Sequence, residues 1–197
     1  MKSLESQDSQ TILKFEKIAP EIYVKLQGLK RTGWVRDGVE NPESVKEHTE
    51  SLVKLAIELS ESLTDEEKHG LVEMLEVHDW PEALLGDEVI LELDPEARKV
   101  LKDVKYENEK KALAEICKDL PNGDEIMALW LRYEKSTDPA AVFGRQLDKY
   151  QVIEKALEYE LSQGILLFEN FLNYSVNFIE HPVLLQKVEQ LKSKWKE

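Results

Sequence analysis

The sequence contains a single cysteine, Cys117. One cysteine cannot form an internal disulfide, and a zinc site built from several cysteines is excluded as well. Cys117 lies in a run of residues with the hydrophobic spacing of a helix, so we expect a buried thiol with a structural role.

Long hydrophobic runs are also missing. A membrane-spanning helix needs about eighteen or more consecutive apolar residues, and the chain contains no such run. Its first six residues are polar and lack the apolar segment of a signal peptide. We therefore expect a cytoplasmic or nucleoplasmic protein with no membrane partner.

Positive charge is scarce. The chain has 26 lysines and arginines against 40 aspartates and glutamates, which gives a formal net charge of −14. Such a field repels nucleic-acid backbones, and we find no basic patch large enough to overcome it. We expect no nucleic-acid partner. Small anionic substrates remain compatible, because a bound cation dominates the electrostatics around it.

The alternating pattern of β-strands, internal repeats and low-complexity linkers are absent too. At 197 residues the chain has room for one domain with a substantial core. We predict an all-α fold, with a flexible N-terminus over residues 1–10 and a single helical domain over residues 11–197. Its last two helical segments are predicted within residues 165–195.

Several helix boundaries have local signals. Pro20 divides the first helical run, and residues 30–38 read as a loop with two glycines. A helix begins near residue 44, where Ser44 or Asn41 is the cap, and a second begins at Thr64. Pro95 interrupts the segment 88–104, so the next helix is predicted over about 97–119, followed by 123–134 and by one that starts after Asp138.

Three predicted helices carry groups that can bind a metal. His48 and His78 lie on apolar helix faces, Asp79 follows His78, and Asp148 lies at the edge of a third face. The alternative for either histidine is a core side chain with one hydrogen bond. A buried carboxylate, however, is costly unless it is paired or bound to a cation. Nitrogen and oxygen donors without thiolates suit manganese, iron, cobalt, nickel or zinc rather than calcium.

These residues form the pattern H…HD…D, and the chain resembles the HD-domain metal-dependent phosphohydrolases. Residues 40–48 look like the E-x-V-x-E-H approach to the first histidine in the 5′-deoxynucleotidase branch of that family. The stretch from His78 to Asp87 matches its H-D-x-x-E-x-x-x-G-D. Residues 30–34 resemble its basic and aromatic segment, and residues 146–149 resemble the segment with the last ligand. The similarity spans about residues 25–160.

The resemblance implies an HD-domain helical bundle with the metal site between helices. It also implies an enzyme that hydrolyses nucleoside 5′-monophosphates, with a preference for deoxyribose, to nucleoside and phosphate. The ligands of one divalent ion would be His48, His78, Asp79 and Asp148. Manganese, cobalt, zinc, iron, nickel and magnesium all stay open as its identity, and relatives suggest a homodimer.

The substrate-handling residues implied by the resemblance are Glu82, Asp87, Arg31 and Trp34. Glu82 would orient or deprotonate the attacking water, and Asp87 would act on that water or on a sugar hydroxyl. Arg31 would bind the phosphate, with Arg36 as the alternative. Trp34 offers an aromatic face for the sugar or base, although a tryptophan taken alone is more often a core residue than a stacking surface.

Two other functions remain open. One is an HD hydrolase that acts on another small phosphoester or on a nucleoside triphosphate. The other is a catalytically inactive helical module retained for protein contacts. The loss of a metal ligand would favour the inactive module, and here all four ligand positions are filled.

Overall fold

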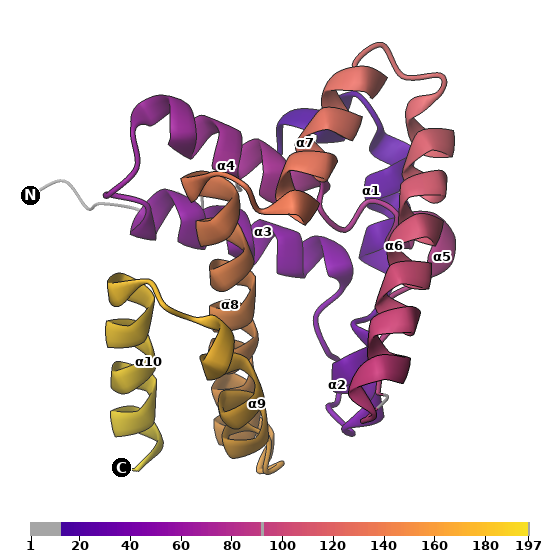
Figure 1. Cartoon of the computed structure of the whole chain (residues 1–197). Coiled ribbons are helices and arrows are strands. Elements are labelled where there is room, and N and C mark those ends of the chain that lie inside the picture. The colour runs from indigo at the N-terminus through magenta and orange to yellow at the C-terminus, as the bar shows by residue number, and fades with distance from the viewer. Residues whose placement is uncertain (1–12, 92, 197) are drawn as a thin grey trace, which may run out of the picture.

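The protein consists of helices joined by turns and short connections (Figure 1). The computed structural model describes residues 13–91 and 93–196, so the predicted flexible segment 1–10 lies outside the described residues. Over these two ranges no β-strand is formed, which confirms the all-α prediction. The elements are η1 (Lys14–Lys17), α1 (Pro20–Gly28), α2 (Thr32–Arg36), α3 (Val45–Leu59), α4 (Asp65–Val77), α5 (Glu82–Leu85), α6 (Pro95–Cys117), α7 (Gly123–Lys135), α8 (Pro139–Gln163), α9 (Phe168–Ser175), η2 (Val176–Phe178) and α10 (Pro182–Trp195).

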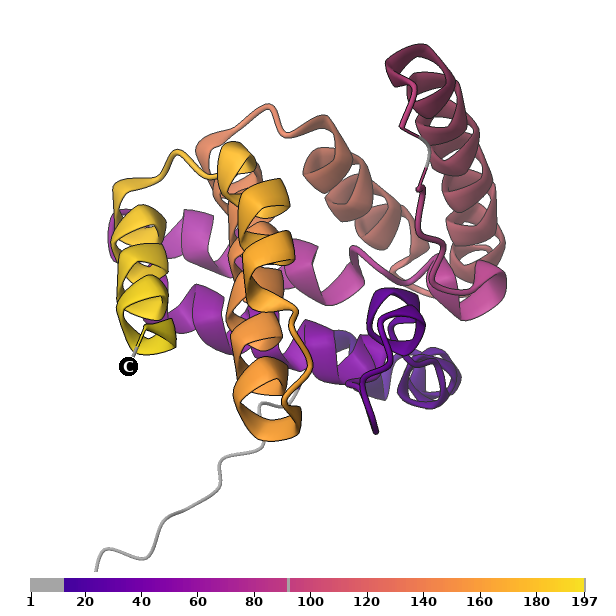
Figure 2. The same ribbon diagram turned by 90° about the horizontal axis from the view of Figure 1, so that it is seen from below.

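Helices α3 and α4 form the centre of the molecule. Helix α4 contacts α3, α7 and α8, and α8 also contacts α3, α9 and α10. Helices α6 and α10 lie at opposite ends of the molecule, which both views show (Figures 1 and 2). No helix in the described part of the chain is both long enough and apolar enough to cross a membrane.

Both helices at the centre begin with a capping box. Ser44 Oγ accepts a hydrogen bond from the Glu47 backbone N–H, and Glu47 Oε2 accepts one from the Ser44 N–H at 2.6 Å. Thr64 and Glu67 repeat this arrangement at the start of α4. Each pair satisfies two backbone donors that a helix leaves free at its N-terminus. Ser44 is therefore the cap, and His48 follows in the first turn of α3.

One local prediction was wrong, and two helices differ from the predicted ones in their bounds. Residues 32–36, predicted as loop, form the short helix α2, and Asp87 Oδ2 accepts a hydrogen bond of 2.6 Å from the Thr32 N–H at its start. The helix predicted over about 97–119 is confirmed as α6, and it begins two residues earlier, at Pro95, because Asp94 caps it and a proline is tolerated at the first helical position. The segment predicted as one helix over 165–179 forms two elements. Helix α9 covers Phe168–Ser175, and the 3-10 turn η2 follows it directly.

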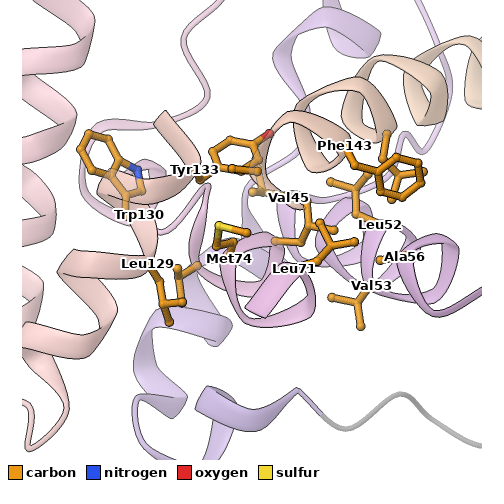
Figure 3. Packing of buried hydrophobic residues seen from close by; sticks show 14 of the residues in the cluster. Val45, Leu52, Val53, Ala56, Leu71, Met74, Leu129, Trp130, Tyr133 and Phe143 are labelled. Carbon is orange, nitrogen blue, oxygen red and sulfur yellow. The ribbon is translucent and has the colours of Figure 1, made fainter. Parts of the chain in front are cut away.

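The core joins α3, α4, α7 and α8 (Figure 3). Val45, Leu52 and Leu71 are fully buried within it. Gly144 lets α8 approach α4 closely, since a Cβ at this position would lie only 3.0 Å from Leu71 Cδ1. Cys117 is buried in the same core, as predicted.

A buried carboxylate ties the N-terminal elements to α4. Glu76 accepts hydrogen bonds from the backbone N–H groups of Lys14 and Phe15, at 2.9 and 2.5 Å, and from Tyr23 Oη at 2.6 Å. Burial raises the pKa of Glu76, and these three donors act in the opposite direction. Nothing in the local sequence around Glu76 signals these partners.

We expect Glu76→Ala to lower the free energy of unfolding by about 3 kcal/mol or more, because three buried donors lose their acceptor at roughly 1–3 kcal/mol each. Urea unfolding followed by circular dichroism measures the change. Glu107→Ala, on an exposed position of α6, is the control and should change the value by no more than about 0.5 kcal/mol. Equal stability of the two variants would contradict a structural role for Glu76.

Candidate metal centre

A pocket of about 740 Å³ lies between α6 on one side and α8 with η2 on the other. Its size is within the range of about 300–1,000 Å³ that is common for small-molecule sites. The lining includes His78, Asp79, Glu82, Asp87 and Asp148, so the acidic motif residues of the sequence meet in one place. A second hollow of about 780 Å³ is lined largely by lysines and glutamates of α3 and α8 and contains no histidine in its lining.

His48 reaches this centre from α3 and is completely buried. Its Nδ1–H donates to Gln151 Oε1 at 2.9 Å, and Gln151 Nε2 in turn donates to Glu43 Oε2 at 3.1 Å. The carboxylate of Glu43 accepts only, so the amide oxygen of Gln151 must face the imidazole. This fixes the proton on Nδ1 and leaves Nε2 with a free lone pair.

His78 follows the last residue of α4 and is oriented in the same way. Its Nδ1–H donates to the backbone carbonyl oxygen of Leu75 at 2.7 Å, which again leaves the Nε2 lone pair free. The indole of Trp130 donates to the carbonyl oxygen of His78 at 3.1 Å and holds the backbone at this turn. The two imidazole rings lie 5.6 Å apart between centroids.

Carboxylate oxygens face both lone pairs. Asp148 Oδ1 lies 3.3 Å from His48 Nε2, and Asp79 Oδ2 lies 3.1 Å from His78 Nε2 and 3.8 Å from His48 Nε2. One ligand atom each from His48, His78 and Asp148 lies within 4.8 Å of the others. The buried His48 Nε2 has no hydrogen-bond partner. Lone pairs that face one another in this way repel unless a cation lies between them, so these residues fit a divalent metal ion.

The pKa shifts of His78, Asp79 and Asp148 also favour a cation at this site. Burial acts to lower the pKa of His78, yet the carboxylates of Asp79 and Asp148 outweigh it and raise that pKa. Burial acts to raise the pKa of Asp79 and of Asp148. His78 and Arg31 nevertheless hold the pKa of Asp79 below its usual range, and Lys149 does the same for Asp148. The local field therefore favours positive charge at this point of the fold.

Glu82 lies beside the ligands. Residues 78–81 form a turn whose Trp80 is buried edge-to-face against Phe15 and Tyr23, and the Glu82 N–H donates to the Asp79 carbonyl oxygen at 3.0 Å. Glu82 is 5% exposed, and its Oε2 has no hydrogen-bond partner. Burial and the nearby carboxylate of Asp79 raise its pKa well above the usual value.

Arg31 lies in the pocket and Arg36 does not. The guanidinium of Arg31 is 3.2 Å from Asp79 Oδ2 and 3.8 Å from Asp87 Oδ1. Arg36 instead pairs with its neighbour Asp37 at 2.7 Å. Asp87 also accepts two hydrogen bonds from Thr32, one at its side chain and one at its carbonyl oxygen, both of 2.6 Å. Asp87 therefore holds the segment that carries Arg31.

Trp34 corrects the expectation of an aromatic face in the pocket. Its side chain is 3% exposed and packs against Tyr159 and Phe171, with ring centroids 5.3 and 4.5 Å away. Its indole N–H donates to Glu43 Oε1 at 3.0 Å. A second small core on α8 and α9 covers the ring, which is the core position that the sequence leaves as the alternative.

Several residues of the site lie outside the motifs. Gln151 is one helical turn beyond Asp148, so a search of the same helix face for a partner of His48 could have found it. Lys105 and Glu109 of α6 also line the pocket, 3.4 Å apart, and Lys105 donates to the Glu88 carbonyl oxygen at 2.7 Å. Burial raises the pKa of Glu109 to about 7. No signal in α6 indicates these two residues.

Several known proteins with similar sequences are named 5′-deoxynucleotidase. The chain is 33% identical over 181 residues to the 5′-deoxynucleotidase HDDC2 of Dictyostelium discoideum, which covers 86% of this chain and 92% of the relative. It is 30% identical to the human 5′-deoxynucleotidase HDDC2, over 86% of this chain and 80% of the relative.

Solved structures share the fold. A conserved hypothetical protein from Pyrococcus furiosus matches with a TM-score of 0.68 and 28% identity, over 87% of this chain and 96% of that one. A predicted metal-dependent phosphohydrolase from Magnetospirillum magnetotacticum matches with a TM-score of 0.64, at 23% identity, over 90% of this chain and 91% of that one. At 23% identity, the match to the Magnetospirillum protein shows a shared fold only.

The family model for the HD domain matches residues 24–193. The match includes all four predicted ligands and extends beyond residue 160, where the resemblance of the motifs ends. It also includes α9, η2 and most of α10, which contribute to the pocket wall or pack on α8. The chain belongs to the HD domain family.

Proposed function

We propose that this protein is a metal-dependent 5′-nucleotidase that hydrolyses deoxynucleoside 5′-monophosphates to nucleoside and phosphate. The observation that carries the proposal is the convergence of the two imidazole lone pairs with Asp148, beside a pocket whose lining includes His78, Arg31 and Glu82. Relatives named 5′-deoxynucleotidase at about 30% identity support the same substrate class.

His48, His78, Asp79 and Asp148 would hold one divalent ion. When bound, such an ion lowers the pKa of a coordinated water and neutralises charge on a phosphoryl oxygen. Manganese, cobalt, zinc, iron, nickel and magnesium all remain candidates, because the donor set does not distinguish them.

The other pocket residues have separate roles around the phosphate. Arg31 binds a phosphoryl oxygen with its guanidinium, and Asp87 positions Arg31 through its contacts with that residue and with Thr32. Glu82 accepts a proton from the attacking water, since it lines the pocket, its buried Oε2 has no other hydrogen-bond partner, and its raised pKa makes the carboxylate a stronger base. Trp34 acts on this machinery only indirectly, by anchoring α2.

We also propose that residues 11–197 work as one domain, that two copies form a homodimer, and that the protein is cytoplasmic with no nucleic-acid partner. One core cluster that includes residues from Leu13 to Trp195 supports the single domain. Exposed Leu84, Val100 and Val104 on α5 and α6 support an interface between copies. Sedimentation velocity of the full chain measures the oligomeric state.

Metal-dependent release of phosphate should occur with nucleoside 5′-monophosphates and not with 3′-monophosphates. The assay uses chelator-treated protein, deoxy and ribo forms of each nucleotide, and manganese, cobalt, zinc or magnesium added singly. Turnover of triphosphates or unrelated phosphoesters alone would show a different HD hydrolase. No turnover of any substrate, with metal bound or without, would favour the inactive module.

His78→Ala should abolish metal binding and turnover together, because it removes one ligand from the centre of the site. Metal content after dialysis, measured by mass spectrometry, and phosphate release give the two values. His69→Ala is the matched control, since the His69 side chain is 73% exposed and lies outside the pocket lining. A His78→Ala variant that keeps both metal and activity would refute the assignment.

Glu82→Gln should keep the metal and lower kcat by about a hundredfold or more, because the amide cannot accept the proton of the water. Its folding is tested by circular dichroism and its metal content by mass spectrometry. Glu107→Gln, on the exposed surface of α6, should leave kcat unchanged. If the Glu82→Gln enzyme turns over at the normal rate, another group serves as the base.

A further inference from the structure

Two aromatic side chains at the pocket remain without a role. The sequence contains four tryptophans, six tyrosines and five phenylalanines, and all fifteen lie within the described ranges. Only Tyr174 and Phe178 among them are exposed, at 54% and 50%. Both line the pocket whose lining also includes His78, Asp79 and Asp148. Exposed aromatic pairs of this kind commonly mark a binding surface.

The two rings form one surface at the rim. Tyr174 lies in the last turn of α9 and Phe178 ends η2, with ring centroids 5.7 Å apart and an interplanar angle of 54°. Such a surface is apolar and exposed, whereas Arg31 and the carboxylates of Asp79 and Asp148 in the same pocket lining are largely buried. A ligand with an aromatic part and an anionic part fits this division.

Helix α8 connects the aromatic pair to the metal ligands. Gln146 Oε1 accepts hydrogen bonds from the backbone N–H groups of Glu180 and His181, at 2.7 and 2.8 Å, just beyond Phe178. Asp148 is two residues further along the same helix. Val142, another lining residue, precedes Asp148 by six residues, which is about 9 Å along a helix that rises about 1.5 Å per residue.

The other aromatic rings of the pocket are already in contact with protein groups. Tyr106 stacks on Trp130, with centroids 5.5 Å apart and planes at 20°. Tyr133 is buried, with the guanidinium of Arg145 5.2 Å from its ring centroid and the imidazole of His78 5.1 Å away. The faces of Tyr174 and Phe178 are the ones left open to a planar ligand.

We propose that Tyr174 and Phe178 bind the nucleobase of the substrate by stacking. This inference rests on the proposed nucleotidase function. It concerns the nucleobase, which is the part of the substrate farthest from the reacting phosphate. The phosphate lies at Arg31 and the ligands, the sugar crosses the floor beside α8, and the base reaches the rim. Gln146 is a positioning residue for this surface.

Stacking at this surface should be tolerant of the base. Two polar side chains of the same part of the lining are engaged with backbone: Asn177 Nδ2 donates to the Asn173 carbonyl oxygen at 2.8 Å, and Gln146 accepts the two N–H groups. Every base presents a π-face, so stacking contributes affinity without strong selection. Purines, which have the larger face, should gain most from it.

The test compares a deoxynucleoside 5′-monophosphate with 2-deoxyribose 5-phosphate, which has the same phosphate and sugar but no base. In the metal-loaded full chain, Tyr174→Ala and Phe178→Ala should each raise KM for the nucleotide about tenfold. They should change kcat and the KM for the sugar phosphate by less than about twofold, because the reacting groups are untouched. Tyr174→Phe and Phe178→Tyr should restore the KM of the unmodified protein.

Leu166→Ala is the matched control, since Leu166 is 83% exposed and lies outside the pocket lining. Unchanged KM in both alanine variants would overturn the inference while the nucleotidase function stands. A change in sedimentation without a change in KM would also overturn it, because the rings would then belong to a contact between copies.

Equilibrium dialysis separates this inference from the nucleotidase function. It uses a labelled nucleoside 5′-phosphonate that cannot be hydrolysed, with the same metal-loaded proteins. If the protein releases no phosphate from nucleotides, the proposed function fails. Even if the protein releases no phosphate, loss of phosphonate binding in the Tyr174→Ala and Phe178→Ala variants would support the role of these two rings in binding the base. No binding to the unmodified protein, or equal binding to the variants, would refute it.

Discussion

The hydrogen bonds at the Nδ1 atoms of His48 and His78 determine what the pocket can do. Each imidazole donates there to an oxygen, His48 to Gln151 and His78 to the carbonyl of Leu75. Both Nε2 lone pairs are consequently directed toward the carboxylates of Asp79 and Asp148. With the opposite tautomers, the same four residues would form internal hydrogen bonds, and the site would have little need of a cation.

This orientation depends on packing far from the ligands. Gly144 allows α8 to approach α4, which brings the helix with Asp148 and Gln151 against the helix that precedes His78. After His78, Trp80 packs edge-to-face against Phe15 and Tyr23, and both of these residues donate hydrogen bonds to Glu76. The turn with Asp79 and Glu82 is thus supported by the N-terminal elements, although these contribute no group to the pocket.

The parts of this arrangement that the sequence predicts are those with local causes. A capping box involves residues three positions apart, so Ser44 and Glu47 identify the start of α3 without knowledge of the fold. The hydrophobic period then places His48 inside. Helix α2 was missed because the acceptor of its first N–H is Asp87, 55 residues away. The sequence alone favours a core position for Trp34, whereas the motif favours a binding surface, and the packing of α8 and α9 on the ring decides for the core.

The aromatic rim also bears on how an acidic protein can bind an anion. With a net charge of −14, the field of the whole chain opposes the approach of a phosphate, but salt screens such a field beyond about 8 Å. Affinity must then come from short-range contacts: Arg31, a bound cation, and groups without charge. The proposed stacking on Tyr174 and Phe178 involves no charged group, so it should depend little on the surrounding carboxylates or on ionic strength. An acidic nucleotidase would therefore depend on its aromatic surface more than a basic one, because its net charge gives the phosphate no long-range attraction.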